Sequence, residues 1–81
     1  MSVITATREE TITSVLETAF GAVNVSVKQV TDILDNTPKE DIFLSVRDLI
    51  WINYSGGGYA NLIAARLFKA LGLESDIPAT I

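Results

Sequence analysis

The sequence contains no cysteine and no histidine. The first absence excludes disulfides, thiol chemistry and zinc–thiolate sites, and the second removes the commonest metal ligand and proton shuttle near neutral pH. A serine nucleophile needs a base to accept its proton, and Ser55 has neither a histidine nor a lysine close to it in the sequence. We therefore expect a protein that is not an enzyme and that holds neither a metal nor another cofactor.

Basic residues are few. Six Lys and Arg residues are scattered singly among ten Asp and Glu residues, which gives a net charge of −4. Nucleic-acid binding requires clustered cations, so we expect no nucleic-acid partner. No apolar run approaches the ~20 residues that cross a bilayer, which argues against a membrane partner. The N-terminal segment MSVITATREE has no basic start and no long apolar stretch, and this predicts a cytoplasmic protein.

Apolar residues, in contrast, are plentiful and make up 48% of the 81 residues. A chain of this length forms one domain, 1–81, and buries only a modest fraction of its surface. The surplus apolar surface of a small domain is usually buried against a partner. We therefore expect a homo-oligomer or a complex with another protein.

Two capping-box patterns predict the first two helices. In such a box a Ser or Thr before the helix and a Glu or Gln three residues later satisfy each other's free backbone amides. The Thr7–Glu10 segment predicts a helix over 8–23, in which apolar residues recur at spacings of three and four. The Ser26–Gln29 segment predicts a shorter helix over 27–36.

The third helix is predicted over 38–54, with Thr37 as its cap, Pro38 in its first position and Glu40 completing the box. Its apolar residues lie nearly all round the helix, and their β-branched side chains leave a strand over 49–52 as the alternative. The explicit cap favours the helix.

The fourth helix is predicted over 58–71, with Gly72 as a left-handed residue after its end. An apolar tail, 73–81, is expected to pack on the body or on a neighbour. Together these segments predict an all-α fold, a small antiparallel bundle of four short helices that is oligomeric.

The most unusual stretch is YSGGGY, from Tyr54 to Tyr59. Glycine amides at a helix N-terminus let an anion come close, and the tyrosines could stack on a base. The candidate ligand-binding residues are Ser55, Gly56, Gly57, Gly58, Arg47 and Arg66.

Several features count against that site. The segment lacks the lysine and hydroxyl residue of a nucleotide-hydrolysing loop, and it does not follow a clear strand. Both arginines are about two helical turns away in the sequence. We favour a corner in which glycine supplies positive φ between two helices.

The favoured function is a non-enzymatic protein–protein interaction module, an adaptor, inhibitor or regulator that acts through an apolar helical face. Trp51 is the only tryptophan and serves either as an interface anchor or as a core residue. The candidate interface residues are Trp51, Ile52, Tyr54, Tyr59 and Leu62. The alternative is an oligomer that binds a small phosphorylated or nucleotide ligand at the glycine corner, with Arg47 or Arg66 of a neighbouring chain supplying charge.

Overall fold

The computed structural model describes residues 7–19, 24–54 and 57–79. Across these ranges the regular elements are helices, which confirms the predicted all-α class. The α-helices are α1 Arg8–Glu17, α2 Val27–Asn36, α3 Ile42–Asn53 and α4 Ala60–Ala70, and the short 3₁₀ helices are η1 Lys39–Asp41, η2 Gly57–Tyr59 and η3 Glu74–Asp76. The strand alternative over 49–52 is wrong, because those residues belong to α3. No helix in the described ranges is long and apolar enough to cross a membrane.

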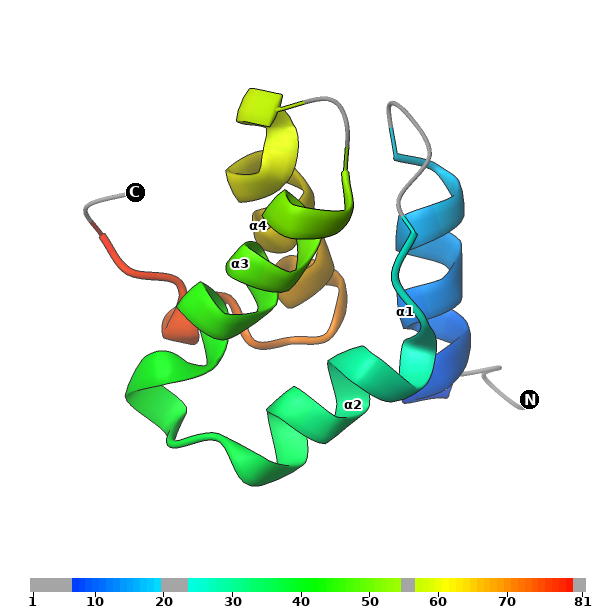
Figure 1. Cartoon of the computed structure of the whole chain (residues 1–81). Helices are drawn as coiled ribbons and strands as arrows, with labels where there is room; N and C mark the ends of the chain where they lie inside the picture. The colour runs from blue at the N-terminus through cyan, green and yellow to red at the C-terminus, as the bar shows by residue number, and fades with distance from the viewer. Residues whose placement is uncertain (1–6, 20–23, 55–56, 80–81) are drawn as a thin grey trace.

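The helices pack around α4, which contacts both α3 and α1. Figure 1 shows α3 ending and α4 beginning at the same end of the molecule. In the same view α2 lies across the other end, where it contacts α1 and α3. This arrangement separates the glycine corner from the far end of α4, where the chain continues into η3.

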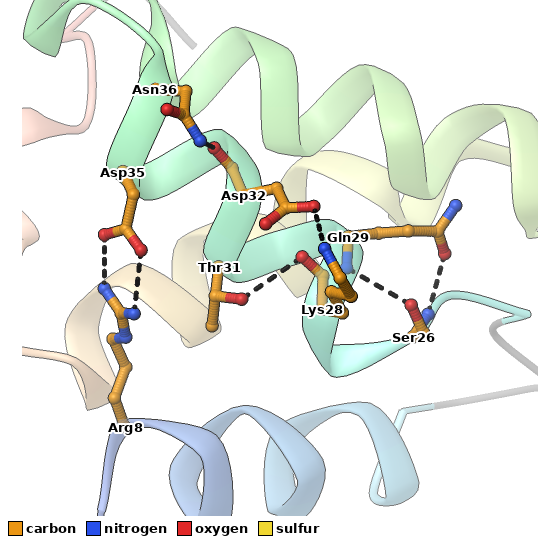
Figure 2. Close-up of polar contacts among 8 residues, drawn as sticks. All are labelled: Arg8, Ser26, Lys28, Gln29, Thr31, Asp32, Asp35 and Asn36. Carbon is orange, nitrogen blue, oxygen red and sulfur yellow. Dashed lines mark hydrogen bonds and ion pairs between the residues drawn. The ribbon is translucent and has the colours of Figure 1, made fainter.

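Both predicted capping boxes are present at the starts of α1 and α2. The amide of Glu10 donates to the hydroxyl of Thr7 over 3.1 Å, and the amide of Thr7 donates to a Glu10 carboxylate oxygen over 2.8 Å. Ser26 and Gln29 make the equivalent pair of bonds, at 3.2 and 2.8 Å, as Figure 2 shows. These local bonds fix where the first two helices begin.

Two predicted helix boundaries are wrong. The helix predicted over 8–23 ends at Glu17, and the hydroxyl of Thr18 donates back to the carbonyl of Ser14 over 2.9 Å. Residues 20–23 lie outside the described ranges. A Thr hydroxyl bonded in this way competes with the helical backbone ladder, and this is typical of a helix end.

The cap predicted at Thr37 is absent. Thr37 is extended, and its amide donates to the carbonyl of Ile33 over 3.1 Å, so it ends α2 instead of starting α3. Pro38 disfavours the helical conformation in the residue before it, and it is itself extended at φ −54° and ψ 144°. The chain therefore makes the 3₁₀ turn η1 before α3 begins at Ile42.

The core lies mainly between α3 and α4. Its centre is an edge-to-face pair of Phe43 and Phe68, with ring centroids 5.2 Å apart and planes at 74°. Taken as whole residues, no polar or charged residue within the described ranges is buried, although the Asp76 side chain is only 6% accessible. The buried residues are Ile12, Val30, Ile42, Phe43, Val46, Ile50, Tyr54, Ala60, Ile63, Ala64, Leu67 and Phe68.

Helix α4 ends as the sequence predicts, at a left-handed glycine. Gly72 has φ +77°, and its amide donates to the carbonyl of Lys69 over 3.2 Å. The amide of Leu73 donates to the carbonyl of Phe68 over 2.8 Å, which completes a Schellman motif. The motif turns the chain so that η3 packs back on α4.

Candidate functional site

Three large apolar side chains are exposed on α3. They are Leu44, Trp51 and Ile52, with 39, 55 and 78% of their surface accessible. At the helical step of ~100° per residue, Leu44 and Trp51 share the side opposite the buried Val46 and Ile50, and Ile52 lies next to them. The interface interpretation of Trp51 therefore fits its exposure better than the core interpretation.

Two more exposed apolar side chains lie where α4 begins. Tyr59 is 49% exposed in η2, and Leu62 is 45% exposed in the first turn of α4. Because α3 ends where α4 begins (Figure 1), these two residues belong to the same end of the molecule as Trp51 and Ile52. We call Trp51, Ile52, Tyr59 and Leu62, together with Leu44 of α3, the apolar surface group.

Tyr54 was predicted for the same interface, and that prediction is wrong. Only 6% of its surface is accessible, and it belongs to the core. Tyr54 follows Ile50 by four residues and therefore lies on the same side as the buried Ile50 and Phe43, and the backbone leaves the helix at Tyr54, with φ −128° and ψ 121°.

The glycine corner is described in part. Ser55 and Gly56 lie outside the described residues, and η2 leads from Gly57 directly into α4. Gly58 is exposed, and a Cβ added there would meet no atom within 4 Å. Gly58 does not have the positive φ that was expected for the corner, so this position does not require glycine for its backbone conformation.

The two candidate arginines have different surroundings. Arg47 is hydrogen-bonded to its neighbour in α3. Its Nε and Nη2 donate to Asp48 Oδ1 over 3.1 and 2.8 Å. Arg66 is exposed on α4 and makes no ion pair with any described residue. An anion at the corner would therefore compete with Asp48 for Arg47.

The pKa shifts belong to exposed residues outside the apolar surface group. Figure 2 shows Arg8 of α1 reaching Asp35 of α2, and the hydrogen bonds from Arg8 lower the pKa of the Asp35 carboxyl. The same pair raises the pKa of Arg8. The backbone amide of Thr7 lowers the pKa of Glu10, and Asp32 raises the pKa of Lys28. The described residues contain no group of three carboxylates that could hold a metal ion.

A cavity that the sequence did not predict lies at the far end of α4 from the glycine corner. Its volume is about 570 Å³, within the range of roughly 300–1,000 Å³ usual for small-molecule sites. Residues from α1, α2, η1, α3, α4 and η3 meet there. The lining residues are Arg8, Thr11, Leu34, Thr37, Lys39, Ile42, Ala70, Leu71, Leu73 and Asp76.

Two ion pairs involve residues of this cavity. Arg8 is bound to Asp35 over 2.8 Å, and Lys39 Nζ lies 3.3 Å from Asp76 Oδ1. The two partners of the second pair differ in exposure, because the Lys39 side chain is 76% accessible and that of Asp76 only 6%. A smaller hollow of about 430 Å³ shares Lys39 and Asp76 with the cavity.

Comparisons of the chain with protein-family models, with curated protein sequences and with solved structures give no match. The described residues present two surfaces, the apolar surface group and the cavity. The first consists of exposed apolar side chains, and the second combines an aliphatic lining with charged residues.

Proposed function

We propose that the protein is a non-enzymatic interaction module that associates with a second copy of itself through the apolar surface group. The observation that carries the proposal is the exposure of Trp51 and Ile52, at 55 and 78%, in consecutive positions of α3. Tryptophan is enriched among the residues that dominate binding energy. Full burial of one large apolar side chain is worth about 1.5–3 kcal/mol, so several such residues can support a dimer.

The charges beside this surface favour a second copy as the partner. Arg47 and Asp48 follow each other on α3, between Leu44 and Trp51 in the sequence. A two-fold interface pairs each surface with an identical one, so an adjacent acid and base are self-complementary across it. The net charge of −4 therefore does not oppose contact at this face.

The wider proposal is a cytoplasmic adaptor, inhibitor or regulator in which the same surface group binds another protein. We also propose that the helices form an antiparallel bundle within each copy. The supporting feature is the end of the molecule shared by the last turn of α3 and the first turn of α4 (Figure 1).

Sedimentation velocity across low to high micromolar concentrations tests self-association. The chain is expected to change from monomer to dimer, and the emission of its single tryptophan, Trp51, should shift to shorter wavelength as the indole is buried. The variant Ile52→Gln is expected to weaken the dimer at least tenfold, and the matched control Ile52→Leu should retain it. A wild-type chain that remains monomeric throughout would refute the proposal.

The second candidate function is the binding of a small phosphorylated or nucleotide ligand at the glycine corner. The observations in its favour are the open space at Gly58 and the start of α4, where the side chain of the N-cap residue makes no capping hydrogen bond. A thermal-shift series with inorganic phosphate, ADP and ATP at millimolar concentration tests it, because a ligand that binds the folded chain raises its melting temperature. Unchanged melting with all three would exclude this function.

A further inference from the structure

The cavity at the far end of α4 has an aliphatic region and a polar region. Leu34, Ile42, Leu71 and Leu73 come from α2, α3 and the end of α4, and they provide apolar lining. The first turns of α1 provide Arg8 and Thr11. A site with this division suits a molecule that is apolar at one end and polar at the other.

The polar region keeps hydrogen-bonding capacity although Arg8 is already paired. Arg8 donates through Nη1 and Nη2 to the two oxygens of Asp35, at 2.8 and 3.0 Å. A guanidinium has further N–H donors, which remain for a second acceptor. The hydroxyl of Thr11, one turn along α1, makes no hydrogen bond with any described residue.

Charges of both signs lie near Arg8, because two cations line the cavity and Glu9 and Glu10 occupy the same first turn of α1. Arg8 lies in the first turn of α1, and the positive end of a helix dipole stabilises negative charge. Lys39 adds a second cation to the lining, with an ammonium that bonds Asp76 and is otherwise largely exposed. Arg8 is already paired with Asp35, and Lys39 with Asp76, so a bound anion would be an additional acceptor rather than the first.

We propose that this cavity binds a small amphipathic carboxylate. The carboxylate accepts hydrogen bonds from Arg8 and from the hydroxyl of Thr11, and the aliphatic chain lies on Leu34, Leu71 and Leu73. The apolar lining supplies affinity by removing the chain from water, and Arg8 sets the orientation. This site does not include Trp51 and Ile52 in the last turn of α3, the two residues whose exposure carries the proposed self-association.

Octanoate is the probe, and the full chain is titrated with it while methyl NMR signals and melting temperature are recorded. The expected result is a set of saturable shifts at the methyls of Leu34, Leu71 and Leu73. Because the ligand binds only the folded chain, melting should rise by on the order of 5 °C at ten times the dissociation constant. Acetate, which has the charge without the chain, should have no effect, and octan-1-ol should bind at least fivefold more weakly than octanoate.

Two pairs of variants locate the site. Arg8→Gln should weaken octanoate binding at least fivefold, whereas Arg66→Gln, the same change at an exposed arginine of α4, should leave it unchanged. Ala70→Phe introduces bulk beside the cavity without altering charge and should also weaken binding at least fivefold. Its matched control, Ala79→Phe, changes an exposed alanine outside the cavity.

Three outcomes would overturn the proposal. The first is binding of octan-1-ol that equals that of octanoate, since the charge would then have no role. The second is a set of shifts centred on Ile52 and Leu62, which would place the probe on the apolar surface group. The third is equal affinity in Arg8→Gln and Arg66→Gln. Affinities are measured by NMR on the folded protein, so a lower stability of either variant does not affect this comparison.

Discussion

Arg8 and Asp35 connect the first turn of α1 to the last turn of α2 through two hydrogen bonds, of 2.8 and 3.0 Å. The residues are 27 positions apart in the sequence, and the bidentate geometry fixes the orientation of both side chains. Their side chains are 41 and 54% accessible, so water and salt screen the charges. The pair therefore orients the two helices more than it stabilises the fold.

The first prediction concerns this pair. Asp35→Asn and Arg8→Gln should each lower the melting temperature slightly, and the double variant should lose less than the sum of the single losses, because both remove one interaction. The coupling should decrease when the salt concentration is raised from 0.01 to 1 M, over which the screening length falls from about 30 to 3 Å. Thermal unfolding of the four proteins at both salt concentrations measures this, and a coupling that is insensitive to salt would contradict it.

The second prediction concerns acid. The hydrogen bonds from Arg8 hold the pKa of Asp35 below its ordinary value of 3.8, and the Thr7 amide holds that of Glu10 below 4.5. A carboxyl with a lowered folded-state pKa stabilises the protein above its unfolded-state pKa, and this stabilisation is lost as the pH falls through the folded-state pKa. The free energy of unfolding should therefore be constant around neutral pH and decrease below about pH 4.5. Urea titrations at several pH values test this, and the decrease should be shallower in Asp35→Asn.

The third prediction concerns the aromatic pair in the core. Phe68→Ala should lower the free energy of unfolding by about 3–5 kcal/mol, because it leaves a cavity and removes the ring contact with Phe43. A domain of this length has roughly 4–12 kcal/mol in total, so the variant should be partly unfolded at physiological temperature. Ile52→Ala, at a residue 78% exposed, should change stability in the monomer by about 0.5 kcal/mol or less. Urea denaturation measures both, and equal losses would contradict the assignment of core and surface.

The fourth prediction compares two glycines. Gly72→Ala should destabilise the protein by about 1–2 kcal/mol, because a Cβ is strained at the φ of +77° that the Schellman motif requires. Gly58→Ala should be neutral or should stabilise it by up to about 1 kcal/mol, because the site is open and its φ is not positive. Circular dichroism melting of both variants distinguishes them. A reversed order would mean that the corner, and not the end of α4, needs glycine.

The features that the sequence predicted correctly are local in the chain. The capping boxes at Thr7 and Ser26 each need a partner only three residues away, and the motif at Gly72 needs a carbonyl within one turn. The prediction that Thr37 caps the third helix is wrong because two local preferences compete for that residue. It can start the next helix or end α2, and Pro38 favours the extended conformation that ends α2.

The candidate sites were less predictable because they depend on packing. The burial of Tyr54 and the exposure of Leu44 both follow from which side of α3 meets α4. The apolar residues nearly surround α3, so periodicity alone does not identify its buried side. The cavity combines Arg8, Lys39 and Leu73 from distant parts of the chain, and no spacing in the sequence brings these residues together.

The buried residues of the described chain are all apolar or, in Tyr54, aromatic with a hydroxyl. Apolar contacts are not directional, so such a core tolerates exchange of residues of similar volume. Uniqueness of the fold must then come from the periphery, where the Schellman motif at Gly72 and the ion pair of Arg8 with Asp35 fix helix ends at defined positions. Exchanges of similar volume in the interior should therefore cost less than changes at the helix ends that hold the register.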